Sequence, residues 1–347
     1  MKNLSIWVII LNFNDQAHLA KAIDSVKKQN FPNTKILVVD NNSTDNSPAI
    51  IKKIKGIARM LLNQNLGYAA GNNLALKQAF ADGADLCILM NTDLEMKPYC
   101  LKNMLDCYLK ERVNSCGLIQ PSILLTKNEN KINSNGNALH ILGFGYCKDY
   151  NENYQTTTKN RQIISVSGAC MMIPKSYYDD IGDLDENFFL YNEDQAYSWK
   201  GLLRGYKHYL SANSEASHDY SFSKNKNKMY YSESNRLSLL IMLYQVKTLV
   251  FLSPIFLLSE CGILLTALKE KWLSIKIRSY IRFLSQLPVS LKKRSLIQST
   301  RKIKDHSLIK NFDKKLDFDA VKGKHINFFN FIFDRYMKLY KLFNTNK

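Results

Sequence analysis

The sequence predicts an α/β fold, in which a mostly parallel β-sheet flanked by helices is followed by a largely helical and basic C-terminal region. Three observations lead to this prediction. Short apolar runs alternate with helix-like segments over the first 95 residues. Polar residues directly follow the ends of the apolar runs, and the excess positive charge is confined to the last third of the chain. Strands that alternate with helices at short spacing are typical of a parallel sheet covered on both faces.

The first part of the chain supplies the strands and helices in alternation. Apolar runs predict strands at residues 6–11, 35–40, 59–63 and 86–90, and helical spacing predicts helices at residues 17–29, 47–55 and 68–82. Residues 126–162 are rich in Asn, Lys, Thr and Gly and predict loops or an irregular hairpin. A strand interrupted by Ser167-Gly168-Ala169 is expected at residues 163–173, and a helix closed by glycine at residues 194–205.

The net charge of +18 is unevenly distributed along the 347 residues. Residues 1–223 carry 23 Lys and Arg against 22 Asp and Glu, whereas residues 224–347 carry 25 against 8. A near-neutral part joined to a basic part indicates two functional units. We expect the first unit to span residues 1–230 and the second residues 231–347.

The seven cysteines are scattered along the chain and form no Cys-x-x-Cys pair. This pattern argues against a disulfide framework and against a zinc site, and it fits a reducing compartment. The first strand is not preceded by a basic leader or followed by a small-residue cleavage site, so we expect no secretory signal. The expected location is the cytoplasm.

Polar side chains gather where the predicted strands end. Asn12 and Asn14 follow the first strand, Asp40 ends the second, and Asn91-Thr92-Asp93 follows the fourth. In open α/β sheets ligands bind beyond the carboxyl ends of the strands. Asp40 could accept hydrogen bonds from a base or a ribose, or only cap the following turn. Asp93 suits a hard divalent cation that bridges diphosphate oxygens, or an Asx-type turn.

Three further features are each ambiguous when taken alone. The glycine loop of residues 65–73 precedes a predicted helix, where the backbone can approach a phosphate, although such a loop often marks only a turn. Glu193-Asp194 follows a run of aromatic residues and starts a helix, so it fits either a general base or an acidic helix start. His218 fits a metal ligand, a surface residue or a core residue.

Taken in order, these segments resemble family 2 glycosyltransferases, which are inverting enzymes of the GT-A fold, and especially their rhamnosyltransferase-like branch. The similarity covers about two-thirds of the chain, and His218 and Asn235-Arg236 continue it. The matching segments are IILNFN (9–14), VVDNNSTDNS (38–47), NQNLGYAAGNN (63–73), LMNTDL (89–94), SGACMMIPK (167–175) and DENFFLYNEDQAYSWKGLLRGY (185–206).

The resemblance implies roles for the matching positions. It implies a nucleotide-sugar half at about residues 1–95 and an acceptor half at about residues 96–230. It implies a divalent metal, Mg²⁺ or Mn²⁺, held by Asp93 and His218, and catalysis by Glu193-Asp194 with Asp194 as the base. The implied donor-binding residues are Asn12, Asn14, Asp40, Gly67, Gly71, Asn72, Asn91, Gly168 and Ala169. Asn91 stands where the family has the first acid of its Asp-x-Asp element, and Lys200 and Ser234 stand where it often has arginine.

The activity implied is transfer of a rhamnosyl or hexosyl group from a dTDP- or UDP-sugar. The acceptor would be a hydroxyl of a glycan or of a lipid-linked molecule in cell-surface polysaccharide assembly. The metal would neutralise the leaving nucleoside diphosphate. Asp194 would take the proton of the acceptor hydroxyl as that oxygen attacks the anomeric carbon from the opposite face.

The basic region contains an apolar stretch at residues 248–268 that is long enough to span a membrane. Glu260 and Pro254 near its middle argue against a span. We expect amphipathic helices at an anionic membrane surface on the cytoplasmic face. The alternative is that these helices pack on the catalytic unit or on a second subunit of a homo-oligomer.

Three other functions compete with glycosyl transfer. A nucleic-acid-binding protein fits the positive charge, but the chain has no recognisable motif of that kind and its charge is interleaved with apolar stretches, so no nucleic-acid partner is expected. A non-catalytic nucleotide-sugar-binding module would bind without turnover. A nucleotidyltransferase would need a glycine-rich basic loop after the first strand, and IILNFNDQ lacks one.

Overall fold

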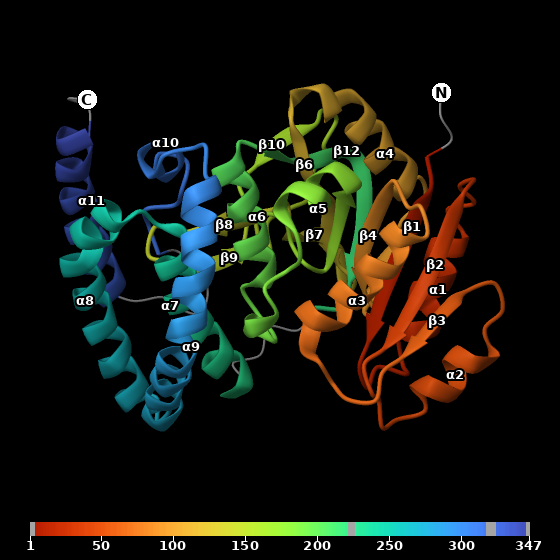
Figure 1. Ribbon diagram of the computed structural model, residues 1–347, viewed down its shortest axis with the longest axis horizontal. Helices are drawn as coiled ribbons and strands as arrows, with labels where there is room; N and C mark the ends of the chain where they lie inside the picture. Colours follow the sequence, from red (N-terminus) through yellow and green to blue (C-terminus); the bar gives the residue numbers. More distant parts are fainter. Residues whose placement is uncertain (1–3, 221–225, 317–323, 345–347) are drawn as a thin grey trace. The chain divides into compact units, whose positions relative to one another are not determined.

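The computed structural model describes residues 4–220, 226–316 and 324–344 of the chain (Figure 1). The chain divides into two compact units. The first unit consists of residues 1–137, 147–201 and 205–222, and the second of residues 138–146, 202–204 and 223–347. The first unit contains the large sheet, and the second contains the helices of the last third.

The large sheet is mixed, and its two halves differ in strand direction. In one half β1 (Ile6–Asn12), β2 (Thr34–Asp40), β3 (Ala58–Leu61) and β4 (Leu86–Asn91) are all parallel, in the order β4-β1-β2-β3. In the other half β11 (Cys170–Pro174) lies antiparallel between β4 and β6 (Cys116–Leu125), and β12 (Lys207–His218) runs parallel to β6. The mostly parallel arrangement expected from the sequence therefore describes the first half.

Short strands complete the sheet at its margins. The strands β5 (Leu94–Met96) and β10 (Arg161–Ile163) pair with β12, and β7 (Asn128–Ser134) pairs with β6. A separate pair is formed by β8 (Asn137–Leu139) and β9 (Gly145–Cys147). The segment expected to be loops or an irregular hairpin thus contains four short strands.

Helices cover both faces of the sheet, which explains why its central strands β1 and β4 are apolar almost throughout. Successive side chains of β1 alternate between two hydrophobic clusters, because neighbouring residues of a strand point to opposite faces. One cluster includes residues of α1 (Leu19–Lys27), α2 (Ser47–Lys53) and α4 (Cys100–Glu111). The other includes residues of α3 (Gly67–Ala81), α5 (Lys175–Ile181) and α6 (Glu193–Arg204).

The second unit is helical, as the sequence predicts. Its helices are α7 (Lys226–Leu243), α8 (Val246–Lys269), α9 (Leu273–Thr300), α10 (Asp305–Ile309) and α11 (Lys324–Asn344). α7 packs along α9, and α8 contacts both α9 and α11. The ring of Phe251 on α8 lies 5.0 Å from the rings of Tyr336 and Tyr340 on α11.

Four charged side chains, which we call the charge cluster, are buried where α7, α8 and α9 meet. They are Glu233 and Arg236 on α7, Glu260 on α8 and Lys276 on α9. Arg236 and Lys276 each form ion pairs with both glutamates, at 3.0 Å for Arg236 with Glu233 and 2.9 Å for Lys276 with Glu260. Tyr280 also donates a hydrogen bond of 2.6 Å to Glu260. Glu260 is therefore neutralised inside the protein.

The opposite face of α8 carries exposed apolar side chains, which we call the exposed stripe. Its members recur every three to seven residues, and they are Val246, Val250, Leu257, Cys261, Leu265 and Leu268. Among the described helices, α8 is long and apolar enough to cross a membrane by length and composition, and 28% of its most apolar window is buried. Of the seven cysteines Cys261 is exposed, Cys147 is partly buried, and the other five are buried.

Candidate functional site

The predicted site residues of the first unit meet because three parallel strands end side by side. The register pairs Asn12 of β1 with Asp40 of β2, and Leu11 with Asn91 of β4. Parallel strands place their carboxyl ends at one edge of a sheet, where α/β proteins bind ligands. β12 adds His218 to this edge, because its antiparallel pairing with β5 sets His218 opposite Leu94.

Asn12 and Asp40 form a buried polar pair at this edge. Asn12 Nδ2 donates to Asp40 Oδ1 at 2.9 Å and to Ser43 Oγ at 3.0 Å. Asp40 Oδ2 accepts from the Ser43 backbone N–H at 3.0 Å, so Asp40 does cap the turn that follows it. Asn12 Oδ1 is buried and has no hydrogen-bond partner among the described residues. Because a buried unpaired acceptor is costly, this atom is available to a ligand donor.

Asn14 connects the loops that follow β1 and β2. Its side-chain Oδ1 accepts from the backbone N–H of Thr44 at 2.7 Å, and its own N–H donates to Ser43 Oγ at 2.9 Å. The residue has a positive φ of 53°, a conformation that asparagine tolerates better than most residues. Asn14 therefore shapes the loop pair beside Asn12 and Asp40.

The glycine loop is held by Asn41, the residue after Asp40. Asn41 Nδ2 donates to Asn65 Oδ1 at 3.0 Å and to the Gly67 carbonyl at 3.1 Å, and Asn41 Oδ1 accepts from Leu66 N–H at 2.9 Å. Gly71 packs against the Leu11 side chain. This geometry fixes the start of α3 next to the end of β1.

Asn72, on the next position of α3, turns its side chain into its own helix. Its Nδ2 donates to the Tyr68 carbonyl at 3.0 Å, while its buried Oδ1 has no partner in the described part of the chain. No side-chain hydrogen bond of Asn72 joins it to another predicted site residue.

Gly67 occupies a position that only glycine fits. Its φ is +79°, and a Cβ there would lie 2.3 Å from the Phe189 carbonyl oxygen. Gly67→Ala should lower the free energy of unfolding by about 2 kcal/mol more than Gly56→Ala, because overpacking adds to the backbone strain. Gly56 is a matched control, since its φ is +76° and a Cβ added there would meet no atom within 4 Å. Equal urea midpoints for the two variants would contradict the proposed close approach.

Asp93 and His218 contact each other directly. His218 Nε2 lies 3.0 Å from Asp93 Oδ1, and His218 Nδ1 lies 2.9 Å from Asn133 Oδ1. Burial raises the pKa of Asp93, but the hydrogen bond and the charge of His218 outweigh it, so the pKa of Asp93 lies below its ordinary value. A carboxylate and an imidazole nitrogen this close can both turn toward one divalent ion.

The fit of a metal depends on ligands from outside the protein. In residues 4–220, 226–316 and 324–344 no three or more His, Cys, Asp and Glu side chains form a group that could hold a metal ion. Mg²⁺ commonly keeps one or two protein carboxylates and takes its other ligands from water and substrate phosphates. Asp93 and His218 therefore fit a site that a diphosphate completes.

Three residues that the sequence reasoning missed surround this pair. His18 lies between two aspartates, with Nδ1 at 2.6 Å from Asp15 and Nε2 at 3.3 Å from Asp219. Asp15 also accepts from Thr92 Oγ1 at 2.6 Å, and the Asp219 N–H donates to the Asp93 carbonyl at 2.9 Å. The hydrogen bond to Asp15 raises the pKa of His18. Asp15 and His18 are three residues apart at a predicted helix start, which is the signal that could have revealed them.

The acidic pair begins α6, and its two carboxyl groups differ in surroundings. Asp194 Oδ2 accepts from Gly168 N–H at 2.9 Å and from Asn137 Nδ2 at 3.2 Å, and Oδ1 accepts from Gln195 N–H at 2.7 Å. Glu193 is buried, and its Oε2 has no partner among the described residues. Burial raises the pKa of both groups, and the charge of Asp194 raises that of Glu193 further.

Hydrogen bonds connect the acidic pair to the strand-end residues. Asn91 N–H donates to the Ala169 carbonyl at 2.9 Å, and Tyr68 OH donates to the Gly168 carbonyl at 2.5 Å. Gly168 in turn holds Asp194. The structure thus brings Asn91, Gly168, Ala169 and Asp194 together, and sequence reasoning missed the contribution of Tyr68.

The loop before the acidic pair is strained. Phe189, Tyr191 and Asn192 have positive φ angles of 40°, 68° and 67°. Such conformations cost about 1–3 kcal/mol each and occur often at functional sites. The Phe189 carbonyl accepts from Tyr68 N–H at 2.7 Å, so this loop also fixes the glycine loop.

With this geometry established, comparison with known proteins identifies the family. The model of the family described as "Glycosyl transferase family 2" matches residues 7–182, slightly more than half of the chain. The chain belongs to glycosyl transferase family 2. Membership of this family confirms the predicted resemblance and the prediction of a glycosyltransferase. The mixed sheet with flanking helices and the helical C-terminal region confirm the predicted fold class.

Relatives and solved structures of known glycosyltransferases are similar at low identity. The chain is 23% identical over 207 residues to the N-acetylglucosaminyl-diphospho-decaprenol L-rhamnosyltransferase of Mycobacterium tuberculosis, covering 54% of this chain and 67% of that protein. It is 24% identical over 141 residues to the low-salt glycan biosynthesis hexosyltransferase Agl10 of Haloferax volcanii, covering 39% and 43%.

Among solved structures, GalNAc-T7 with UDP, GalNAc and Mn²⁺ has a TM-score of 0.57 and 15% identity. The match covers 74% of this family 2 chain and 51% of the GalNAc-T7 chain. At this identity the likeness shows a shared fold.

Proposed function

We propose that this family 2 glycosyltransferase moves a rhamnosyl or hexosyl group from a dTDP- or UDP-sugar to a hydroxyl of a glycan or lipid-linked acceptor. The observation that carries the proposal is the position of Asp194, whose carboxylate is held by Gly168 and Asn137 and has a raised pKa. A carboxylate with a raised pKa is a suitable general base. The relatives that act in glycan assembly support the class of acceptor.

In this proposal the reaction is a single displacement that inverts the anomeric carbon. Asp194 accepts the proton of the acceptor hydroxyl while that oxygen forms a bond to the anomeric carbon. The bond from the anomeric carbon to the diphosphate oxygen breaks on the opposite face, and the electron pair leaves with the nucleoside diphosphate. Gly168 N–H and Asn137 Nδ2 orient the carboxylate. Its neighbour Glu193 is buried, and burial together with the charge of Asp194 raises the pKa of Glu193.

The donor is assigned to the edge where β1, β2 and β4 end. Asn12, Asn14 and Asp40 would contact the nucleoside, and the unpaired Asn12 Oδ1 supports this assignment. The positions assigned to the diphosphate and the sugar come from the glycine loop and from the segment beside Asp194. They are Gly67, Gly71, Asn72, Asn91, Gly168 and Ala169.

Asp93 and His218 would hold a divalent cation, Mg²⁺ or Mn²⁺. When bound, such an ion neutralises charge that develops on the leaving diphosphate. The 3.0 Å contact between the two side chains supports this assignment, as does the Mn²⁺ of the structurally similar GalNAc-T7. His218 is fixed by Asn133, which selects the ring nitrogen that faces Asp93.

Metal dependence can be measured without turnover. Mn²⁺ should tighten UDP or dTDP binding at least ~10-fold in the wild type, because the diphosphate oxygens would become ligands of an ion that the protein also holds. Asp93→Ala should abolish this gain while metal-free nucleotide affinity stays the same. Asp106→Ala is a control, since Asp106 is an exposed carboxylate paired with Lys102 on α4. Isothermal titration that gives equal affinities with and without Mn²⁺ would refute the assignment.

We also propose that residues 231–347 hold the enzyme on the cytoplasmic face of the membrane, while residues 1–230 carry out catalysis. The exposed stripe and the basic charge of this region support the proposal. Glu260 is buried and paired with Arg236 and Lys276, so the stripe can meet lipid without placing an unpaired charge in it. Helices of this kind lie in the interface rather than across it.

Vesicle flotation tests the membrane proposal. The protein should float with anionic vesicles and dissociate as salt is added, because exposed charges are screened at high ionic strength. Replacing Leu257 and Leu265 of the exposed stripe by Gln should weaken flotation. Binding that is indifferent to both salt and these substitutions would rule out this surface.

A further inference from the structure

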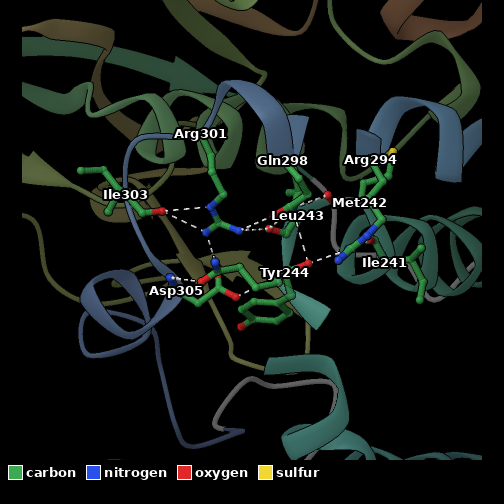
Figure 2. Close-up of polar contacts among 10 residues, drawn as sticks. Ile241, Met242, Leu243, Tyr244, Arg294, Gln298, Arg301, Ile303 and Asp305 are labelled. Carbon is green, nitrogen blue, oxygen red and sulfur yellow. Dashed lines mark hydrogen bonds and ion pairs between the residues drawn. The ribbon is translucent and has the colours of Figure 1, made fainter. Parts of the chain in front are cut away.

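An open hollow of about 510 Å³ lies in the second unit, where α8 begins and α9 approaches its end. Figure 2 shows the polar side chains at this place and the carbonyl groups that end α7. The lining side chains are of two kinds. The polar ones include Gln245, Arg294, Gln298 and Arg301, and the apolar ones are Val246 and Leu291.

The two arginines of the hollow differ in how many of their N–H groups are occupied. Arg301 donates to the Ile303 and Leu243 carbonyls and to Gln298 Oε1, and it forms an ion pair with Asp305 (Figure 2). Every nitrogen of its guanidinium group therefore has a partner.

Arg294 uses only Nη1, which donates to the carbonyls of Ile241 and Tyr244, the latter at 2.6 Å. A guanidinium has five N–H groups. In the described part of the chain Nε and Nη2 of Arg294 have no hydrogen-bond partner, and no carboxylate forms an ion pair with it. Arg294 is thus the member of the pair that can bind an anion.

Two charged side chains, Asp305 and Arg301, act on Arg294. Asp305 is almost fully buried, forms an ion pair with Arg301 and accepts a hydrogen bond from the Gln245 N–H at 2.7 Å, so its carboxylate is already engaged. Burial lowers the pKa of Arg294 below its ordinary value, while the charge of Asp305 raises it and the charge of Arg301 lowers it by a smaller amount. The 24-residue helix α8 begins at the hollow, and the side chain of its N-cap residue Gln245 makes no capping hydrogen bond. The unpaired N–H groups of a helix start favour an anion.

The rim of the hollow is apolar and belongs to the face proposed to meet the membrane. Val246 and Leu291 line the hollow and are about half exposed or more, at 64% and 49%. Val250 follows Val246 by one turn of α8, and Leu296 lies further along α9, both at 67% exposure. Inorganic phosphate would leave these apolar side chains exposed to water, whereas the glycerol and acyl chains of a phospholipid would cover them.

We propose that this hollow binds the phosphate of an anionic phospholipid, with Arg294 as its principal ligand and the acyl chains against Val246, Val250 and Leu291. The inference rests on the proposed attachment to the membrane and deepens it. It replaces diffuse attraction to the surface by a site that recognises one phosphate group. Basic pockets beside membrane-facing helices bind headgroups in this way.

Arg294→Lys separates a headgroup site from diffuse attraction, because it keeps the positive charge and removes the planar fork. The full-length protein is titrated with phosphatidylcholine vesicles that contain phosphatidylglycerol. We expect Arg294→Lys to bind them ~10-fold more weakly, the loss typical of one charge-assisted hydrogen bond. Arg278→Lys is the matched control, since Arg278 is exposed on the same helix and outside the hollow. If the two variants bind equally, the headgroup site is refuted.

A measurement on the wild type keeps the inference testable should Arg294→Lys unfold. Monomeric dihexanoyl-phosphatidylglycerol should raise the unfolding temperature, and dihexanoyl-phosphatidylcholine should not. Inorganic phosphate at the same concentration should have little effect. Equal stabilisation by inorganic phosphate would overturn the assignment to a lipid, and no stabilisation by phosphatidylglycerol would overturn the site.

The outcomes also distinguish this inference from the proposals it builds on. A wild type that binds no anionic vesicle contradicts both the membrane proposal and the hollow. A wild type that binds, together with an Arg294→Lys variant that binds equally well, contradicts the hollow alone. UDP affinity in the presence of Mn²⁺ should be the same in all variants, because Arg294 belongs to the second unit. A loss of that affinity in Arg294→Lys would indicate misfolding. The unfolding temperature of the wild type with dihexanoyl-phosphatidylglycerol then decides whether the hollow binds the headgroup.

Discussion

Asp194→Asn should lower turnover at least ~100-fold, which is the contribution typical of a general base. The amide keeps the size of the carboxylate and can still accept from Gly168 N–H, but it cannot take the acceptor proton. Donor affinity should change little, because the variant leaves Asn12, Asp40 and the glycine loop intact. Single-turnover rates, with donor affinity measured separately, test this expectation.

Glu193→Gln is the informative comparison. Oε2 of Glu193 has no hydrogen-bond partner among the described residues, so we expect Glu193→Gln to lower turnover less than Asp194→Asn does. Near-normal turnover in Asp194→Asn with an inactive Glu193→Gln would reverse the two roles. Normal turnover in both would place the base elsewhere and leave the pair as a helix start.

The pH profile should show the environment of the base. Burial raises the pKa of Asp194 above its ordinary value of 3.8, so the acidic limb of kcat/KM should lie above the usual carboxyl range. Turnover should fall as the pH drops through this raised pKa, because the protonated group cannot accept a proton.

Lys276→Met should strongly lower the free energy of unfolding of the second unit. This change removes one cation from the charge cluster and leaves Glu233 and Glu260 buried with a single positive partner, Arg236. Breaking a buried ion pair typically costs about 3–5 kcal/mol. Urea denaturation, with hydrogen exchange of peptides from α7, α8 and α9, should locate the loss in the second unit. Lys269→Met is the control, because Lys269 is exposed at the end of α8.

Acid should weaken the same cluster. Burial opposes ionisation of Glu260, but the charges of Arg236 and Lys276 outweigh it and lower its pKa from 4.5 to about 2. The ionised carboxylate of Glu260, paired with Arg236 and Lys276, therefore stabilises the fold fully above pH 4.5. This contribution is lost as the pH falls toward 2. A shift of this size corresponds to about 3 kcal/mol. An unchanged stability of Glu260→Gln relative to the wild type between pH 7 and pH 3 would contradict the lowered pKa.

The sequence predicted the strands and helices of residues 6–91 closely, because buried parallel strands are continuous apolar runs bounded by turn residues. The strand expected at residues 163–173 is found only at Cys170–Pro174. The fourth strand, expected at residues 86–90, is found at Leu86–Asn91. The order of the strands could not be predicted in the same way. β11 lies antiparallel between β4 and β6, and this pairing depends on packing between segments far apart in sequence.

The polar segment after β6 contains a strand, β7, that its hydrophobic pattern does not predict. β7 has exposed residues in its first half and buried ones in its second, so neither a period of two nor an apolar run marks it as a strand. Its hydrogen bonds to β6 stabilise it instead. Tertiary pairing of this kind has no local signal.

For the candidate site, residue types were predictable and contacts were not. Strand ends and family motifs pointed to Asp93 and His218, which are 125 residues apart and 3.0 Å from each other. His18 was missed because its two partners come from different loops. Glu260 was predicted only as a charge that disfavours a membrane span, since its partners lie on other helices.

The exposed stripe of α8 carries its own attachment point for a reporter. Cys261 is exposed, whereas burial raises the pKa of the thiols of Cys100 and Cys107 to about 12 and that of Cys170 well above its ordinary value. Thiolate is the nucleophile, so a maleimide dye should react first at Cys261 in the native chain. The emission colour of a solvatochromic dye there reports directly whether α8 lies in water or among acyl chains, with no engineered substitution.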